Sequence, residues 1–229
     1  MTRSVQVAFV AIAIILAFGA GAVLYRHLHP GGQPAASDAP AELVAPVAGI
    51  AKRAVPDSVP DFSLKDLEGR PHSIREWSGR PLVINFWATW CGPCRDEIPL
   101  LQRLRRERAA DRLEVVGIAV DFHDDVQAFL KKTPIDYPVL VGEENGVQVA
   151  ASLGIIDLAL PFTVFADHDG RILVLRLGQL HEDQAKLILD TLREVDSGAL
   201  PLPEGRARVA AGLRNARPAP SPSKPENPA

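Results

Sequence analysis

The stretch FWATWCGPCRDEIP, residues 86–99, holds both cysteines of this 229-residue chain. Cys91 and Cys94 are separated only by a glycine and a proline. The run RPLVINFWAT (80–89) leads into the pair and is nearly continuously apolar, which is typical of a strand buried on both faces. The run after the pair, 94–110, has apolar residues at helical spacing. The cysteines are therefore expected where a buried strand passes into a helix.

The rest of the central region alternates between strand and helix patterns. We expect strands at 113–121 and 137–142 and a hairpin at 162–178, and helices at 124–132, 145–154 and 181–195. Asp124 and Asp125 would open their helix as N-cap residues. This order indicates an α/β fold in which helices flank a central mixed sheet.

The amino-terminal segment, residues 1–29, is expected to be a membrane anchor or a signal segment. Its run 5–24 carries no charge, and a helix of that length spans roughly 30 Å, the thickness of the hydrocarbon layer. A signal peptide could be cleaved near the small residues 19–22, but its apolar region is usually shorter than this run. We therefore favour an uncleaved anchor.

Composition also defines the other boundaries of the chain. Residues 30–59 are rich in Ala, Pro and Gly, which indicates a flexible linker. Residues 60–196 have the size of one folded domain. Residues 197–229 form a Pro-rich tail that is expected to be disordered, apart from a short helix that could form around Arg206 to Arg214. The net charge of −3 is mild and gives no basic footprint for nucleic acid.

The cysteine pair is best explained as a redox pair. A disulfide between residues three apart closes almost no loop and would stabilise the fold little, and a structural zinc site needs four ligands where the pair supplies two. At a helix N-terminus, free amides and the helix dipole would stabilise the thiolate of Cys91. Cys94, one turn later, could then resolve a mixed disulfide, and Pro93 needs no amide partner there.

The motif FWATWCGPC resembles the active site of thioredoxins, and Pro99 matches the proline that kinks their active-site helix. The longer run VPDFSLKDLEGRPHSIREWSGRPLVINFWATWCGPCRDEIP, residues 59–99, more specifically resembles the membrane-anchored thioredoxin-like proteins of the TlpA/ResA type. The resemblance covers nearly all of residues 60–196. It implies a thioredoxin-like fold with an extra mid-domain strand–helix unit, which residues 114–142 could supply.

The resemblance also implies a substrate-binding surface beside the cysteines. Leu160 and Pro161 match the family's cis-proline, which packs against the pair. Trp90, Gly92 and Pro93 would complete this surface. No metal or other cofactor is implied for the site.

Glu97 matches a glutamate that lies near the cysteines in the ResA type. It follows Cys94 by three, so on a helix the two share a face. A carboxylate there could relay protons and raise the thiol pKa. A solvated glutamate near the helix start would explain the residue equally well. Asn85 stands where thioredoxins have a buried aspartate, which favours Glu97 as its substitute.

These features together predict an extracytoplasmic thiol–disulfide oxidoreductase, and the resemblance favours a reductase. The catalytic domain would lie in the periplasm, held to the bacterial inner membrane by one helix, or would be soluble there after signal cleavage. The implied partners are a transmembrane thiol carrier and oxidised clients, either C-x-x-C segments such as those of apocytochrome c or the copper-site cysteines of an oxidase subunit.

Three other functions remain as alternatives. A copper metallochaperone could use Cys91 and Cys94, with His123 as a further donor. A thiol peroxidase of this superfold would carry T-x-x-C, whereas Thr89 precedes Cys91 by two. A non-catalytic adaptor would not need both sulfurs.

Overall fold

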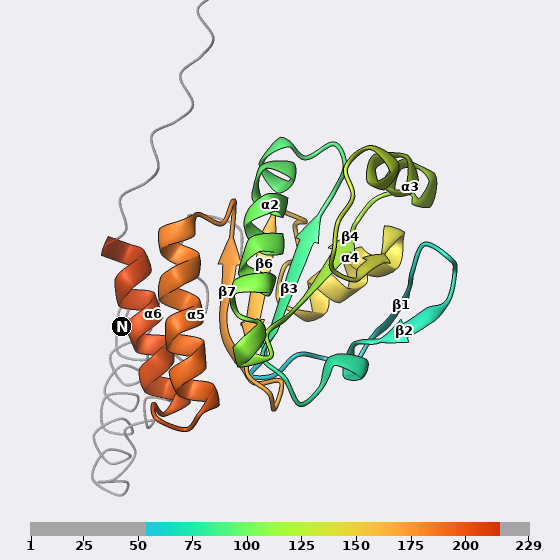
Figure 1. The fold of residues 1–229 in the computed structure, drawn as a ribbon. Helices are drawn as coiled ribbons and strands as arrows, with labels where there is room; N and C mark the ends of the chain where they lie inside the picture. The colour runs from blue at the N-terminus through green and yellow to red at the C-terminus, as the bar shows by residue number, and fades with distance from the viewer. Residues whose placement is uncertain (1–53, 216–229) are drawn as a thin grey trace, which may run out of the picture. The chain divides into compact units, whose positions relative to one another are not determined.

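A mixed sheet organises the part of the chain that the computed structural model describes, residues 54–215 (Figure 1). Within that range the sheet has seven strands in the order β2-β1-β5-β4-β3-β6-β7. The strands are β1 (Ser63–Lys65), β2 (Pro71–Ser73), β3 (Leu82–Trp87), β4 (Glu114–Ala119), β5 (Val139–Val141), β6 (Phe162–Ala166) and β7 (Ile172–Leu177). The helices are α2 (Gly92–Glu107), α3 (His123–Lys132), α4 (Glu143–Ser152), α5 (Glu182–Asp196) and α6 (Leu202–Asn215), with short 3-10 turns at Ile74–Trp77 and Ala109–Asp111.

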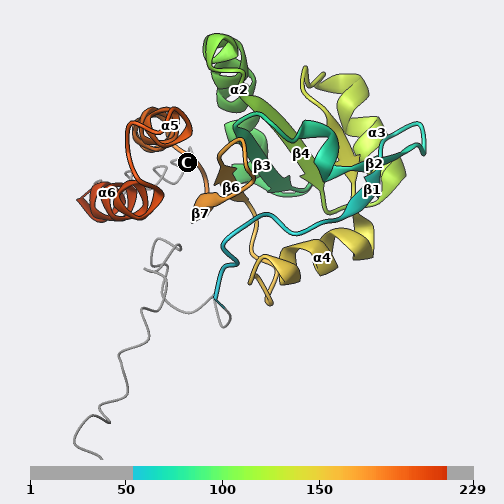
Figure 2. The ribbon, with the colours of Figure 1, turned by 90° about the horizontal axis from the view of Figure 1, so that it is seen from below.

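Helices cover both faces of the sheet, as Figure 2 shows from below. The cores on the two faces follow the strand alternation of β3. Ile84 and Phe86 pack into the core that α4 covers, and Val83 packs into the core beneath α2 and α5. Trp87 packs near the cysteines with α2 and α3. All residues of β3 are buried, which confirms the prediction of a strand buried on both faces.

The chain order places the active-site segment at the centre of the sheet. β3 is parallel to β4 and antiparallel to β6, and β4 is parallel to β5. Residues 114–142, which the resemblance implied as an extra mid-domain strand–helix unit, contain β4, α3 and β5. The predicted α/β thioredoxin-like fold is confirmed.

The starts of two helices differ from the sequence prediction. The N-cap of α3 is Phe122, whose side chain makes no cap hydrogen bond. Asp124 and Asp125 lie in the first turn instead, where they still oppose the positive end of the helix dipole. α4 begins at Glu143, ahead of the expected residue 145, and ends at Ser152.

The amino-terminal boundary of the domain lies before residue 60. Val55 is 7 % exposed and belongs to the core beneath α4. Ser58 pairs with Arg171 in an isolated β-bridge. The last residues of the expected linker are therefore packed against the β6–β7 hairpin. The expected anchor, 1–29, lies outside the described residues; within 54–215, no helix combines the length and apolarity needed to cross a membrane.

The carboxyl-terminal boundary also differs, because α6 occupies part of the expected disordered tail. Its apolar residues Leu202, Val209 and Leu213 pack into the core beneath α5. Gly205 allows a close approach, since a Cβ there would lie 2.6 Å from Val195 Cγ2 on α5. Spacings of seven and four residues put the three apolar side chains on one helix face, and this face accounts for the ordered helix.

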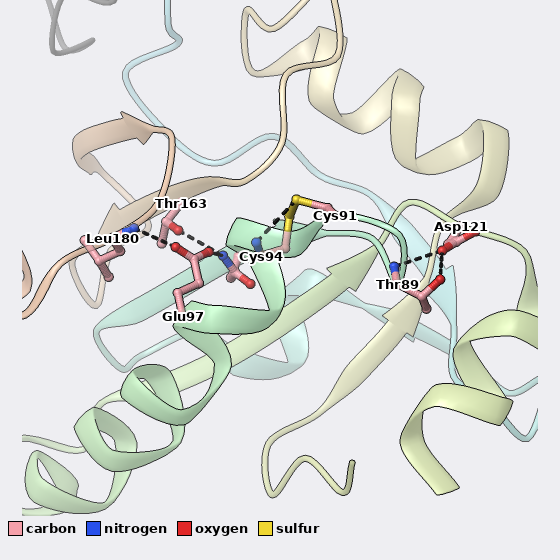
Figure 3. Close-up of a disulfide and its surroundings, with 8 residues drawn as sticks. Thr89, Cys91, Cys94, Glu97, Asp121, Thr163 and Leu180 are labelled. Atoms are coloured by element: carbon pink, nitrogen blue, oxygen red, sulfur yellow. Dashed lines mark hydrogen bonds between the residues drawn. A yellow bond between two sulfur atoms is a disulfide. The ribbon is translucent and has the colours of Figure 1, made fainter. Parts of the chain in front are cut away.

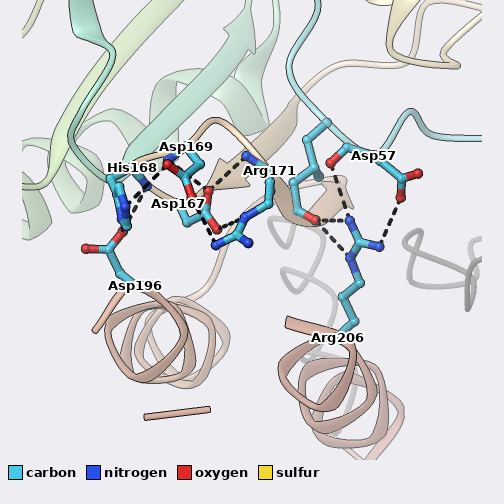
Figure 4. Close-up of polar contacts among 8 residues, drawn as sticks. Asp57, Asp167, His168, Asp169, Arg171, Asp196 and Arg206 are labelled. Atoms are coloured by element: carbon cyan, nitrogen blue, oxygen red, sulfur yellow. Dashed lines mark hydrogen bonds and ion pairs between the residues drawn. The ribbon is translucent and has the colours of Figure 1, made fainter. Parts of the chain in front are cut away.

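Polar contacts fasten both ends of the domain to the β6–β7 hairpin (Figure 4). Arg206 on α6 donates to the carbonyl of Ile172 at 3.0 and 2.8 Å and to the carboxylate of Asp57 at 3.1 Å. His168 in the hairpin turn bonds Asp196 at the end of α5 at 2.8 Å. α6 is thereby joined to the segment where the chain enters the domain.

Candidate active site

Cys91 and Cys94 form a disulfide at the start of α2, with an S–S distance of 2.01 Å and a Cα–Cα distance of 5.3 Å (Figure 3). Cys91 is the N-cap residue, and its sulfur accepts a hydrogen bond of 3.3 Å from the amide of Cys94. Cys91 is 6 % exposed and Cys94 is fully buried. The strand–helix junction predicted for the pair is thus present, and Cys91 is the sulfur nearer to solvent.

The residues expected to bind substrate surround the pair. Pro93 is exposed in the first turn of α2, and Trp90 is 67 % exposed just before Cys91. The Leu160–Pro161 bond is cis, as the resemblance implied. Leu160 packs against the apolar cluster that contains both cysteines. Pro161, at the start of β6, is buried.

Glu97 is buried behind the disulfide, with 1 % of its surface exposed. One carboxylate oxygen accepts a hydrogen bond from Nδ2 of Asn85 at 2.6 Å, and the other accepts one from the amide of Leu180 at 2.6 Å. Figure 3 shows the carboxylate extending from α2 toward Leu180 and Thr163. The interpretation of Glu97 as a solvated residue is therefore wrong.

Burial raises the pKa of Glu97 from 4.5 to about 7. The hydrogen bonds from Leu180 and Asn85 and the positive charge of Arg176 favour the ionised form and offset part of this effect. A carboxyl group with a pKa near neutrality can both donate and accept a proton at physiological pH. A carboxyl group of this kind therefore lies on the helix that carries the cysteines, three residues beyond Cys94.

The partners of Glu97 include residues that the sequence did not point to. Asn85 also donates to the hydroxyl of Thr163 at 3.0 Å. These two residues face each other in the β3–β6 register. The sequence predicted the strands but gave no signal for this register, and the backbone amide of Leu180 carries no sequence signal at all.

Asp121 is a second buried carboxylate near the pair that the sequence reasoning missed. Its Oδ2 accepts hydrogen bonds from the amide and the hydroxyl of Thr89 at 2.9 and 2.5 Å. Asp121 thereby ties the loop before Cys91 to the end of β4. The Thr89 hydroxyl donates its proton within this contact and is turned toward β4.

The histidines of residues 54–215 form no cluster with the cysteines that could hold a metal ion. The ring of His123 bonds the Leu67 carbonyl at 2.9 Å and Asp124 at 3.1 Å, so both of its nitrogens are engaged. Among residues 54–215 there is no group of three or more His, Cys, Asp or Glu side chains placed to hold a metal ion. His123 thus gives no third donor to the copper alternative in this arrangement.

Comparisons with known proteins agree with this geometry. Residues 55–174 match the AhpC/TSA family. The chain is 33 % identical over 135 residues to the thioredoxin-like protein YneN of Bacillus subtilis, which covers 57 % of this chain and 76 % of YneN. It is 28 % identical over 141 residues to the thiol-disulfide oxidoreductase ResA of Geobacillus thermodenitrificans, covering 61 % of this chain and 79 % of that protein.

A solved structure is also similar over most of the domain. The crystal structure of a putative thiol:disulfide interchange protein DsbE from Chlorobium tepidum has a TM-score of 0.54 and 26 % identity, and the match covers 60 % of this chain and 97 % of that one. Together with the Cys91–Cys94 disulfide at a helix N-terminus, these matches establish the chemistry. The chain belongs to the AhpC/TSA family of thioredoxin-like proteins and is a thiol–disulfide oxidoreductase of the ResA/DsbE type.

Proposed function

We propose that the protein reduces disulfides of client proteins outside the cytoplasm, with Cys91 as the attacking thiol. The observation that carries the proposal is the position of Cys91 at the N-terminus of α2, beside the exposed Trp90 and in front of the buried Cys94. Unpaired amides and the helix dipole at that position stabilise a thiolate. The amide of Cys94, which points at the Cys91 sulfur, supplies one such contact.

The reaction is a two-step exchange. The Cys91 thiolate attacks one sulfur of the client disulfide, which forms a mixed disulfide and releases the other client sulfur as a thiolate. The Cys94 thiolate then attacks the Cys91 sulfur, which closes the Cys91–Cys94 disulfide and releases the second client thiolate. Two electrons pass to the client, and two protons end on its thiols.

Glu97 would supply the base for the second step. Cys94 is fully buried and must lose its proton before it can resolve the mixed disulfide. Glu97 is three residues further along α2, and its pKa of about 7 lets it take up that proton at neutral pH. Asn85 and the Leu180 amide hold the carboxylate in place, so their role is to position it.

The direction of transfer and the partners follow from the resemblance. Gly-Pro between the cysteines is the thioredoxin pairing, which favours reduction over oxidation. A reductase outside the cytoplasm needs electrons from a transmembrane thiol carrier. Its clients would be oxidised C-x-x-C segments, such as those of apocytochrome c, or the copper-site cysteines of an oxidase subunit.

The apolar run 5–24 would hold the protein to the inner membrane, with its catalytic domain in the periplasm. Mass spectrometry of the membrane fraction should then find the intact amino terminus. A soluble product beginning near residue 23 would instead show that the run is a cleaved signal peptide.

Trapping tests the assignment of Cys91. In a Cys94→Ala variant the resolving thiol is absent, so a client should accumulate as a mixed disulfide through Cys91, visible on non-reducing gels. The matched control is Cys91→Ala, which retains only the buried sulfur and should trap little. If Cys91→Ala traps the client and Cys94→Ala does not, the two roles are reversed.

A further inference from the structure

Two large aromatic side chains are exposed at the sheet edge where the disulfide follows β3. Phe122 is 71 % exposed and Trp90 is 67 % exposed, more than any other large hydrophobic residue of the part described. Trp90 follows β3 and Phe122 follows β4, which are adjacent and parallel strands. Both residues therefore lie at the same edge of the sheet, the edge to which the carboxyl ends of these strands point.

Asp121 fixes the two aromatic residues relative to each other. Its Oδ2 accepts from the amide and hydroxyl of Thr89, and its Oδ1 accepts from the amide of Phe122 at 2.9 Å. Thr89 is the neighbour of Trp90 along the chain, and Asp121 is the neighbour of Phe122. Figure 3 shows the Thr89–Asp121 contact close to Cys91. The buried carboxylate of Asp121 thus fixes the backbone beside Trp90 and at Phe122.

Phe122 occupies the N-cap position of α3, where phenylalanine is an unfavourable residue. Ser, Thr, Asp or Asn would satisfy a free amide there, whereas the side chain of Phe122 makes no cap contact. The amide of His123 instead donates to the carboxylate of Glu143 at 3.2 Å. Glu143 has a φ of 42°, in the left-handed region that non-glycine residues rarely adopt. Two locally unfavourable features therefore accompany one exposed phenyl ring, a pattern that marks functional positions.

The surface beyond Phe122 is negatively charged. Asp124 and Asp125 are exposed in the first turn of α3, and Glu143 and Glu144 are exposed at the start of α4. The imidazole of His123, between Phe122 and this group, bonds Asp124 at 3.1 Å. α4 follows β5, which is parallel to β4 and adjacent to it. Along this edge the order is therefore disulfide, Trp90, Phe122 and then carboxylates.

We propose that Trp90 and Phe122 form a docking surface for an extended client polypeptide that carries an aromatic or large aliphatic residue beside its cysteine and a Lys or Arg beyond it. The apolar residue packs on Phe122, and the basic residue lies against the carboxylates of Asp124 and Glu144. The surface lies on the β4 side of Cys91, whereas Pro161 precedes β6 on the other side. Because it concerns polypeptide substrates, this proposal rests on the proposed function.

The test compares peptides that contain the same C-x-x-C disulfide and differ only in the flanking residue, Phe or Ser, followed by Lys. The variant is Phe122→Ser, because serine is a favoured N-cap and should preserve α3. The control is Val147→Ala, which removes a hydrophobic side chain, 38 % exposed, from α4. Rates are measured in both directions, with reduced protein on oxidised peptide and with oxidised protein on reduced peptide.

Phe122→Ser should lower kcat/KM for the Phe peptide by about three- to tenfold in both directions, which is the usual size of one aromatic contact. The Ser peptide and a small disulfide such as hydroxyethyl disulfide should be unaffected, and Val147→Ala should behave as wild type. Replacing the peptide lysine with glutamate should lower the rate at low ionic strength. Glu144→Gln or about 0.5 M salt should reduce that difference, because exposed charges are screened.

Equal loss on both peptides, no loss, or the same loss in Val147→Ala would overturn the docking surface. Selective loss on the Phe peptide with oxidation much faster than reduction would support the surface while contradicting the proposed direction of transfer. A wild-type protein that reduces hydroxyethyl disulfide but neither peptide would contradict both.

Discussion

The Nδ2 atom of Asn85 lies 2.6 Å from a carboxylate oxygen of Glu97 and donates a hydrogen bond to it. This contact joins the strand before the cysteines to the helix after them. It places a carboxyl group with a pKa of about 7 in a fully enclosed position one turn beyond Cys94. The fold therefore maintains a costly buried acid next to its redox pair.

The first prediction concerns stability against pH. The pKa of Glu97 is about 7 in the folded protein and 4.5 without the fold. Between these values the folded state binds more protons than the unfolded state, so stability falls as pH rises from about 4.5 to about 7. The total loss is about 3 kcal/mol at 1.36 kcal/mol per pKa unit. Glu97→Gln has no such titration. The free energy of unfolding of the variant minus that of wild type should therefore rise by about 3 kcal/mol between pH 4.5 and pH 7.

Urea unfolding of the oxidised protein measures this difference, because the disulfide-bonded cysteines do not titrate. The same change at the exposed Glu144 serves as the control and should give a profile parallel to wild type. Parallel profiles for Glu97→Gln and wild type would mean that folding does not raise the pKa of Glu97.

The second prediction concerns the thiols of the reduced protein. An ionised Glu97 repels a nearby thiolate, so Glu97→Gln should lower the pKa of Cys91. Where the carboxyl and thiol titrations are coupled, the apparent pKa values belong to the group as a whole. Alkylation rate against pH, with the modified cysteine identified by mass spectrometry, measures the shift. An unchanged profile would contradict an electrostatic effect of Glu97 on the sulfurs. It would not change the roles assigned to Cys91 and Cys94.

Local sequence patterns were sufficient where the deciding interactions are local. The apolar run 80–89 predicted β3, and the cysteines lie at its junction with α2 as expected. The pattern of residues 162–178 predicted the β6–β7 hairpin. The cis bond before Pro161 followed from resemblance, since X-Pro bonds are cis in only about one case in twenty.

Sequence patterns were insufficient where the structure depends on pairing between distant segments. The burial of Glu97 requires the register that sets Asn85 opposite Thr163, and it requires the Leu180 amide from beyond β7. The full length of α6 depends on packing against α5, a segment that precedes it in the chain, and the sequence indicated only a short helix around Arg206 to Arg214. Phe122 was not singled out, because exposure of a single hydrophobic residue is visible only in the fold.

The midpoint potential of the Cys91–Cys94 pair tests the central claim most directly. The protein is equilibrated with dithiothreitol or glutathione redox buffers, and the fraction of disulfide is measured. A reductase with Gly-Pro between its cysteines should lie nearer the value of about −270 mV found for thioredoxin than the value of about −120 mV found for strong oxidants such as DsbA. The interval of about 150 mV corresponds to roughly 7 kcal/mol for two electrons, so the outcomes are well separated. A midpoint near thioredoxin's supports the proposed function, whereas one near about −120 mV would make the protein an oxidant of its clients and contradict it.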